Sequence, residues 1–276
     1  MADGEWRMER GGYTAIRPDC SRVCRRTTTL VTVLPACRRH APRVIDATKA
    51  PIDIAPPRTA VRRGRGADLV ERLGLLGFLA IFGLVRARRS DALDLAVTVK
   101  LQRWSHPLLT RLMAAVSWPG FPPQSRIIPA FPVAALLLAR LPLEALAMIG
   151  AWGTALVATV VKAVMLRPRP VAGVDIRVIA APLGGSSFPS GHTITYVGLY
   201  GFLAYLAYTL LRPAWLRRIV VAPLVALVAL VGPSRVSMGH HWFTDVTASY
   251  LLGLSYLLGL TRLYRRAKAR GTREPA

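Results

Sequence analysis

Apolar residues are gathered into long runs along the chain, and short polar or charged stretches separate these runs. Six runs predict membrane-crossing helices, at residues 69–85, 127–141, 143–166, 192–211, 219–231 and 246–263. About 20 consecutive apolar residues cross the hydrocarbon layer, so the run at 143–166 is the clearest. The first run is the weakest, because only its part from 73 to 85 is free of charge. The pattern therefore predicts an all-α, integral-membrane bundle of six transmembrane helices.

Residues 91–118, between the first two runs, have a different pattern. Apolar residues recur there at helical spacing, at Leu93, Val97, Leu101, Trp104, Leu108, Leu112 and Val116. Lys100, Arg103 and Arg111 lie between them. This spacing predicts an amphipathic helix in the membrane interface, with a break at His106–Pro107 because proline disrupts a helix.

The ends of the chain differ from its middle. Residues 1–66 are rich in Arg, Pro and Thr and contain no apolar run that could build a core, so we interpret them as a disordered N-terminal arm. All three cysteines, Cys20, Cys24 and Cys37, lie in this arm, and their loose spacing favours unligated thiols over a zinc site with His40. Residues 67–265 form the predicted membrane domain, and residues 266–276 form a basic tail.

Composition agrees with a membrane protein. The chain has 276 residues, of which 53% are hydrophobic, and its mean hydropathy is +0.37. Soluble domains rarely average above zero, because their surfaces are polar. The formal net charge of +23 would suit a nucleic-acid-binding protein, but the basic residues lie in the arm, at the ends of apolar runs and in the tail. We therefore expect membrane lipids, and no nucleic acid, as partners.

The order of the runs predicts a topology in the cell membrane. The ends of the third and fifth runs and the starts of the fourth and sixth share one face. The opposite face receives the arginines near residues 62–65, 140, 212–218 and 262–273, and the positive-inside rule makes that face cytoplasmic. Both termini are then cytoplasmic and the loops between the later runs face outward. The basic linker at 86–90 argues against this orientation.

A polar stretch, SRVSMGHHWFTD, lies between the fifth and sixth runs at residues 234–245. On a helix, His241 and Asp245 would share a face, so that Asp245 accepts from Nδ1–H and leaves Nε2 as a nucleophile or base. His240 is about 100° out of register. Arg235 is close enough in sequence to hold an anion in front of the ring. A short polar loop, whose histidines only bond backbone groups, is the alternative interpretation.

A second stretch, KAVMLRPRP, ends the third run. Lys162 lies inside a predicted span, where a charge is costly and usually functional. The alternative is that its long side chain only extends to the membrane interface. Pro168 must end the helix before Arg169. Arg167 and Arg177 add positive charge to the following loop, and we assign them no further role.

A third stretch, GGSSFPSGHT, leads into the fourth run at residues 184–193. Glycine and serine before a helix offer backbone N–H groups to an anion. The hydroxyl of Ser190 can donate, Gly191 permits close approach, and His192 can act as a proton donor. An ordinary turn before a helix is the alternative.

Together the stretches read K-x6-R-P (Lys162, Arg169, Pro170), P-S-G-H (Pro189 to His192) and S-R-x5-H-x3-D (Ser234, Arg235, His241, Asp245). This set resembles the type 2 phosphatidic acid phosphatase (PAP2) family over roughly residues 67–265. The resemblance implies phosphoryl transfer through a phosphohistidine, without a metal or other cofactor. His241 would be the nucleophile, oriented by Asp245, with His192 as acid and base. The phosphate would be held by Lys162, Arg169, Ser190, Gly191 and Arg235.

The expected activity is hydrolysis of a lipid phosphate or diphosphate at the outer membrane face. A lipid phosphotransferase with the same site, and a non-catalytic binder or transporter of lipid phosphates, are the alternatives. Phosphatidate, phosphatidylglycerophosphate and prenyl diphosphates share this headgroup chemistry, so the motifs select none of them. Nothing in the sequence specifies an oligomeric state.

Overall fold

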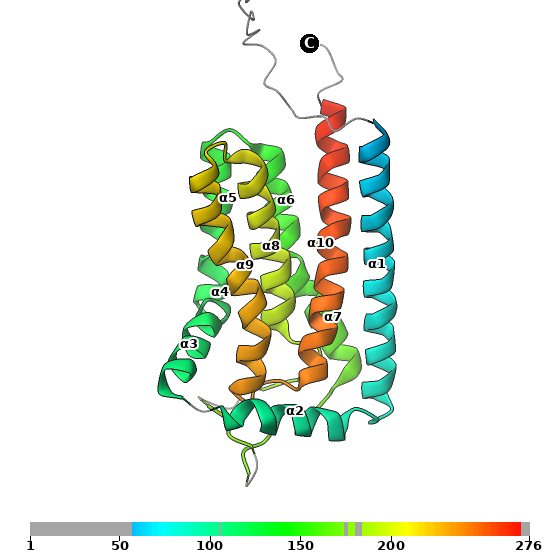
Figure 1. Ribbon diagram of the computed structural model, residues 1–276, viewed down its shortest axis with the longest axis vertical. Coiled ribbons are helices and arrows are strands. Elements are labelled where there is room, and N and C mark those ends of the chain that lie inside the picture. The colour runs from blue at the N-terminus through cyan, green and yellow to red at the C-terminus, as the bar shows by residue number, and fades with distance from the viewer. Residues whose placement is uncertain (1–56, 105, 174–175, 180–183, 272–276) are drawn as a thin grey trace, which may run out of the picture. The chain divides into compact units, whose positions relative to one another are not determined.

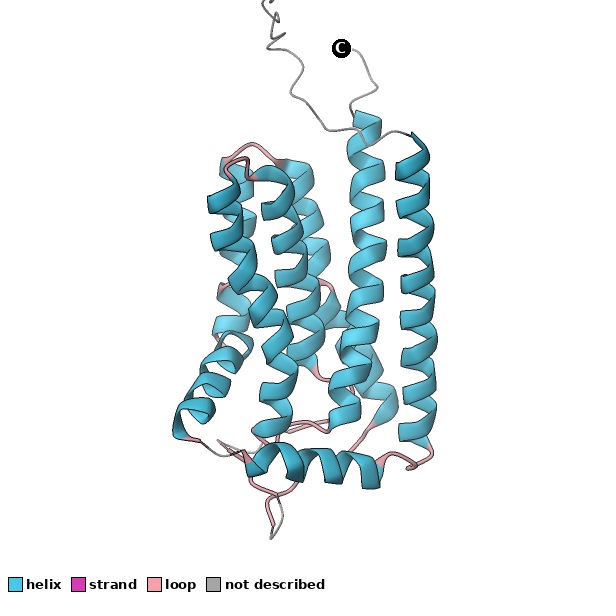
Figure 2. Cartoon of the chain, viewed as in Figure 1, coloured by secondary structure: helices cyan, strands magenta, loops and turns pink. Residues whose placement is uncertain are grey.

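The computed structural model describes residues 57–104, 106–173, 176–179 and 184–271, and every regular element in these ranges is a helix (Figures 1 and 2). The helices are α1 Pro57–Arg86, α2 Asp91–Arg103, α3 Pro107–Ser117, the 3-10 turn η2 Trp118–Gly120, α4 Gln124–Ile127, α5 Ala130–Leu138, α6 Pro142–Trp152, α7 Thr154–Met165, α8 Gly191–Leu210, α9 Ala214–Ser237 and α10 Phe243–Gly271. The predicted all-α class is confirmed.

Among the described residues, four stretches are long and apolar enough to cross a membrane. They are Pro142–Met165, Gly191–Leu210, Ala214–Ser237 and Phe243–Arg270. These stretches correspond to the last four predicted spans. The first predicted span lies in α1, which packs against α10, and the second lies in α4 and α5, a shorter apolar stretch (Figure 1). A total of six spans stays a prediction.

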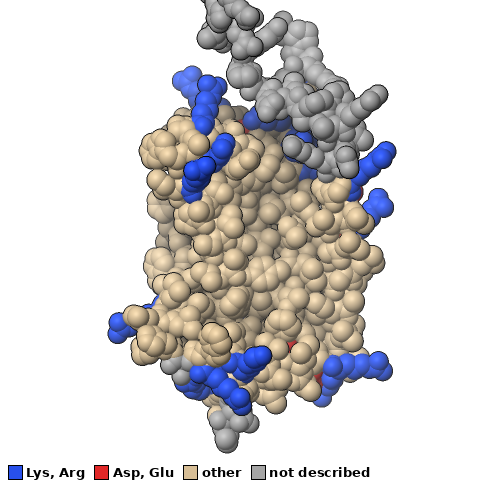
Figure 3. Space-filling view, in the orientation of Figure 1, with Lys and Arg blue, Asp and Glu red and all other residues tan. Residues whose placement is uncertain are grey.

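The outer surface of these helices is apolar. Large side chains such as Leu79, Leu138, Leu156, Val164 and Ile219 are exposed. Figure 3 shows lysines and arginines at the two ends of the helices, with a band of other residues between them. An apolar surface of this extent is unfavourable in water but is favourable against lipid tails. These features identify an integral membrane protein.

Both ends of the membrane domain differ from their predicted bounds. Helix α1 begins at Pro57, inside the segment predicted to be disordered, and residues 1–56 lie outside the described residues. Helix α10 continues to Gly271, so that part of the predicted basic tail is helical. Arg262 on α10 forms ion pairs with Asp68 and with Glu71, the latter at 2.7 Å. These pairs join α1 to α10.

The predicted interfacial helix is two helices. Helix α2 lies across the end of the bundle and α3 rises from it (Figure 1). The predicted break at His106–Pro107 is confirmed: Pro107 begins α3, and Nδ1 of His106 accepts from the Leu108 N–H at 3.2 Å. The buried face of α2 is polar and consists of Asp94, Thr98 and Gln102. Leu93 and Leu95 on the same helix are exposed.

Helix α8 is the centre of the bundle and packs against α6, α7, α9 and α10. Tyr196, Phe202 and Leu206 on α8 are almost fully buried, as are Met148 on α6 and Val231 on α9. At Gly198, α8 passes close to the end of α6 and the start of α7. A Cβ atom there would lie 2.6 Å from Thr154 Cγ2 and 2.7 Å from the Ala151 carbonyl oxygen.

Gly198→Ala is expected to destabilise the protein, since the added methyl group has no room and overpacking costs about 1–3 kcal/mol. Gly83→Ala is the matched control, because a Cβ atom at Gly83 on α1 would meet nothing within 4 Å. Alanine favours a helix over glycine by up to about 1 kcal/mol, so the control should be neutral or stabilising. Thermal unfolding in detergent measures both changes. Equal melting temperatures for the two variants would contradict the packing described here.

Candidate active site

The three predicted motifs meet at one end of the bundle. They lie at the end of α7 and the loop after it, at the start of α8, and at the junction of α9 and α10. Lys162 Nζ donates to the Ser186 carbonyl at 2.6 Å, and Arg169 Nη1 donates to the His240 carbonyl at 2.8 Å. The Ser190 N–H lies 3.4 Å from the Asp245 carbonyl oxygen. Residues more than 50 positions apart in sequence therefore share one site.

The imidazole of His241 is held in one orientation. Its Nδ1 lies 2.8 Å from the carbonyl oxygen of Ser187, and its Nε2 lies 3.3 Å from Arg169 Nη1. A carbonyl oxygen only accepts hydrogen bonds, so the proton of the neutral ring is on Nδ1. The lone pair of Nε2 then faces the guanidinium of Arg169.

The surroundings of His241 also keep the ring uncharged. Its side chain is buried, and burial lowers its pKa well below the usual value. The positive charges of Arg235, Arg169 and Lys162 lower this pKa further, and only the Ser187 carbonyl opposes the shift. At neutral pH the imidazole is therefore uncharged, with a lone pair on Nε2.

Asp245 does not contact His241 in the predicted way. The shortest distance between Asp245 Oδ2 and His241 Nδ1 is 3.7 Å, too long for a hydrogen bond. The i,i+4 argument assumed one helix, but α10 begins at Phe243, after His241. Oδ2 of Asp245 instead accepts from Ser187 Oγ and from the Trp242 N–H at 2.9 Å. The carboxylate holds Ser187, and the Ser187 carbonyl holds the imidazole.

Arg167 has a larger part in the site than the sequence predicted. Its guanidinium is buried and bridges two buried carboxylates, Asp245 Oδ1 at 2.6 Å and Asp94 Oδ2 at 2.7 Å. Burial alone would lower the pKa of Arg167, but the two carboxylates outweigh it and raise the pKa. Asp94 also accepts from the Thr244 N–H at 2.8 Å. This network joins α2, the loop after α7 and the first turn of α10.

Gln102 makes a second connection between α2 and the site. Its amide nitrogen donates to the Arg177 carbonyl at 2.8 Å, and its amide oxygen accepts from the Arg177 N–H at 2.9 Å. Sequence reasoning found neither Asp94 nor Gln102. The available signal was the polar stripe Asp94, Thr98 and Gln102, whose spacing of four places it on one face of a helix.

Arg235 is fully buried and incompletely bonded. Its Nη1 donates to Ser117 Oγ at 3.1 Å, and its guanidinium lies 5.0 Å from the centre of the Phe121 ring. Within the described ranges, Nε and Nη2 have no hydrogen-bond partner. A buried guanidinium without a carboxylate is costly. Its two remaining donors are therefore suited to an anion.

The P-S-G-H motif forms the start of α8. Ser190 is the N-cap, and its Oγ accepts from Thr193 Oγ1 at 3.0 Å, which leaves its own hydroxyl proton available. A Cβ atom at Gly191 would lie 3.8 Å from Lys162 Cε, so the glycine leaves the space beside this lysine open. His192 packs against Phe121, with ring centres 4.8 Å apart. Its buried Nε2 has no partner among the described residues.

The site combines many hydrogen-bond donors with a positive charge. Lys162, Arg169 and Arg235 donate only to carbonyl, hydroxyl or imidazole groups, while Asp245 is paired with Arg167. In the part of the chain that the structure describes, no group of three or more His, Cys, Asp and Glu residues could hold a metal ion. The arrangement suits a phosphoryl group with its oxygens facing the cations.

Neutralising Asp94 is expected to lower stability and activity together. In Asp94→Asn the buried Arg167 loses one of its two buried carboxylates, and breaking a buried ion pair costs about 3–5 kcal/mol. Asp91→Asn is the matched control, because Asp91 lies on the same helix, 3.5 Å from the same guanidinium, but its side chain is 63% exposed. That pair should contribute less than about 1 kcal/mol. Thermal unfolding and kcat measure the difference; equal effects of the two variants would contradict the network.

Comparisons with known proteins agree with this geometry. Residues 142–269 match the family model described as the PAP2 superfamily, a range that contains all three motifs. A solved structure of a transmembrane PAP2-type phosphatidylglycerolphosphate phosphatase from Bacillus subtilis is 24% identical, with a TM-score of 0.63 over 71% of this chain and 96% of that one. Aquifex aeolicus LpxE is 22% identical, with a TM-score of 0.49 over 62% and 95%. None of the curated proteins matches significantly.

The Bacillus subtilis structure shows that the helical fold is shared, and the family match covers the residues that carry the site. Residues 142–269 of this chain, which carry all three motifs, are similar to the PAP2 superfamily.

Proposed function

We propose that the protein is a membrane phosphatase that hydrolyses a lipid phosphate or diphosphate through a phosphohistidine on His241. One observation supports this proposal most strongly. The imidazole of His241 is buried, its Nδ1 is fixed by the Ser187 carbonyl, and its Nε2 lies against the cation Arg169. A neutral nucleophile in front of unneutralised cations fits attack on a phosphoryl group.

In the first step, the lone pair of His241 Nε2 attacks phosphorus. The bond from phosphorus to the lipid oxygen breaks as the nitrogen–phosphorus bond forms. His192 donates a proton to the departing oxygen, which becomes an alcohol or, from a diphosphate, a lipid monophosphate. The bound phosphoryl group takes the place of the contact between Arg169 and His241.

In the second step, water attacks the phosphohistidine. His192, now without the donated proton, accepts a proton from this water. The nitrogen–phosphorus bond breaks, inorganic phosphate leaves, and His241 returns to its neutral form with the proton on Nδ1. General acid and base catalysis of this kind contributes about 10²–10⁴ in rate.

In this proposal, the cationic side chains stabilise the negative charge on the phosphoryl oxygens. Lys162, Arg169 and Arg235, with the Ser190 hydroxyl and the Gly191 N–H, are placed to bind the phosphoryl oxygens. A single preorganised donor of this kind is worth about 2.7–4 kcal/mol of the barrier. We propose that these groups suffice without a metal or a cofactor.

The position of the site suits a lipid. It lies where the membrane-crossing helices end, so a headgroup can enter while its tails remain in the bilayer. We propose that this end faces outward, with both termini on the cytoplasmic side. Arginines lie at both ends of the helices (Figure 3), so this orientation depends mainly on the polar loop between α7 and α8.

Replacement of the two histidines should separate the steps. His241→Ala is expected to lose phosphate release by at least about 10⁴-fold, because the nucleophile is absent. His192→Ala is tested with an aryl phosphate, whose leaving group needs no proton. This variant should accumulate an acid-labile phosphoenzyme, because its active site no longer activates water. Radiolabelled phosphate trapped on the protein measures this intermediate.

His240→Gln is the matched control for this experiment, since His240 is the adjacent imidazole and is also buried. It should still form the labelled intermediate. Full phosphate release by purified His241→Ala, or label that depends on His240 instead, would overturn the proposed mechanism.

Removal of divalent metals tests the cationic part of the proposal. Activity should persist after dialysis against EDTA, because lysine and arginine side chains supply the positive charge at the phosphate. Vanadate should inhibit competitively by occupying the phosphate position. Loss of activity in EDTA, with recovery on adding Mg²⁺ or Zn²⁺, would refute a metal-independent reaction.

A further inference from the structure

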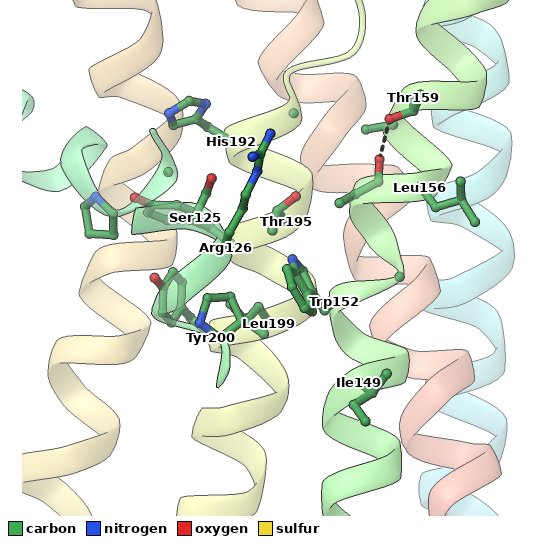
Figure 4. Close-up of a pocket in the computed structure, with 18 of the residues that line it drawn as sticks. Ser125, Arg126, Ile149, Trp152, Leu156, Thr159, His192, Thr195, Leu199 and Tyr200 are labelled. Carbon is green, nitrogen blue, oxygen red and sulfur yellow. Dashed lines mark hydrogen bonds between the residues drawn. The ribbon is translucent and has the colours of Figure 1, made fainter. Parts of the chain in front are cut away.

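A cavity of about 710 Å³ adjoins the active site (Figure 4). Lys162, Gly191 and His192 are among its lining residues. It extends away from them between α7, α8 and the segment that contains η2 and α4. A molecule whose phosphoryl group is at the site would place its next atoms in this cavity.

The lining of the cavity is suited to an anionic amphiphile. Its apolar part includes Ile149, Trp152, Leu156 and Leu199, and this part could hold an alkyl or prenyl chain. The lining contains two cationic side chains, Lys162 and Arg126, and no carboxylate. Lys162 belongs to the family motif, whereas Arg126 does not.

Arg126 is positioned as a separate anion-binding group. It lies on α4, inside the apolar stretch Gln124–Leu138. Its guanidinium points along the cavity toward the end that holds His192, with Thr195 nearby (Figure 4). Within the described residues, no hydrogen bond or ion pair is made by this side chain. Arg126 is the third residue of that stretch and its side chain is exposed, so its guanidinium is available to an anionic ligand in the cavity.

We propose that Arg126 binds a second phosphate in the headgroup of the substrate, between the reacting phosphoryl group and the tail. This inference rests on the proposed phosphatase function. It assigns the substrate to lipids with two phosphates in the headgroup, either a prenyl diphosphate or a phosphatidylglycerol phosphate, in preference to lipids with one phosphate.

The two lipid types would use Arg126 in different ways. In a prenyl diphosphate, His241 attacks the terminal phosphorus and the bond to the bridging oxygen breaks. His192 protonates that oxygen, and the product that leaves is the prenyl monophosphate. Arg126 then lies against the leaving group and affects kcat. In phosphatidylglycerol phosphate the second phosphate is a diester that does not react, so Arg126 affects mainly KM.

The test compares Arg126→Met with Arg126→Lys on matched lipids in detergent. A prenyl diphosphate is paired with the monophosphate of the same tail, and phosphatidylglycerol phosphate is paired with phosphatidate of the same acyl chains. Phosphate release gives kcat and KM. Arg126→Met should lower kcat/KM by about 10–100-fold on the two-phosphate member of one pair, and less than about twofold on its one-phosphate partner. Arg126→Lys should restore part of the loss.

Arg111→Met is the control variant, because Arg111 is an exposed arginine on α3 that does not line the cavity. It should leave both members of each pair unchanged. In the unaltered protein, a prenyl diphosphonate should inhibit more strongly than the monophosphonate of the same tail, which tests the proposal without any substitution.

Equal losses on one-phosphate and two-phosphate lipids, or no loss on either, would overturn the role of Arg126. Equal inhibition by the two phosphonates would also overturn it. The phosphatase function fails separately, through full turnover by His241→Ala. The pair on which Arg126→Met loses kcat/KM only for the two-phosphate member, prenyl or glycerolipid, identifies which of the two lipid types is the substrate.

Discussion

The ion pairs of Arg167 are the contacts on which the site depends. One guanidinium bridges Asp245 at 2.6 Å and Asp94 at 2.7 Å, and all three side chains are buried. Asp245 in turn binds the hydroxyl of Ser187, whose carbonyl orients His241. The position of the imidazole is thus determined by a chain of contacts that begins on α2, a helix outside the membrane-crossing stretches. Buried charges of this kind are stable only when every partner is present.

The same ion pairs leave the site with a net positive charge. Both nearby carboxylates, Asp94 and Asp245, bond to Arg167, and among the described residues neither forms an ion pair with Lys162, Arg169 or Arg235. Those cations are oriented instead by neutral groups: Lys162 by the Ser186 carbonyl and Arg235 by the Ser117 hydroxyl. Carbonyl and hydroxyl dipoles hold a cation in place without cancelling its charge. The residual positive charge lowers the pKa of His241 and favours binding of an anion, so in the proposed mechanism one charge distribution serves both the nucleophile and the phosphate.

Sequence predicted the all-helical class, four of the membrane-crossing stretches and the segments that meet at the site, because apolar runs and short motifs are local patterns. It did not predict the contacts of Asp94 and Ser187, or that Arg126 lines a cavity. Arg167 is 73 residues from Asp94 and 78 from Asp245, and no local spacing relates residues so far apart. It also placed Asp245 directly on His241, since it assumed a continuous helix where the chain turns. The roles assigned to the motif residues stay predictions.

Among membrane helices, a site of this kind needs backbone that is not helical, such as the turn before α10 and the loop between α7 and α8. A helix uses its own carbonyls internally, so it has few acceptors to offer a cation or an imidazole. The loop between α7 and α8 has these acceptors available, and the carbonyls of Gly184, Gly185, Ser186 and Ser187 bind Arg169, Lys162 and His241. Irregular backbone is tolerated in a membrane protein where it is buried in protein or lines a polar cavity. Here it lies where the membrane-crossing helices end, and the polar face of α2 contacts Arg167 and Arg177 of the same loop. The site is therefore confined to the end of the bundle, beside the cavity that we propose holds the headgroup and the start of the lipid tail.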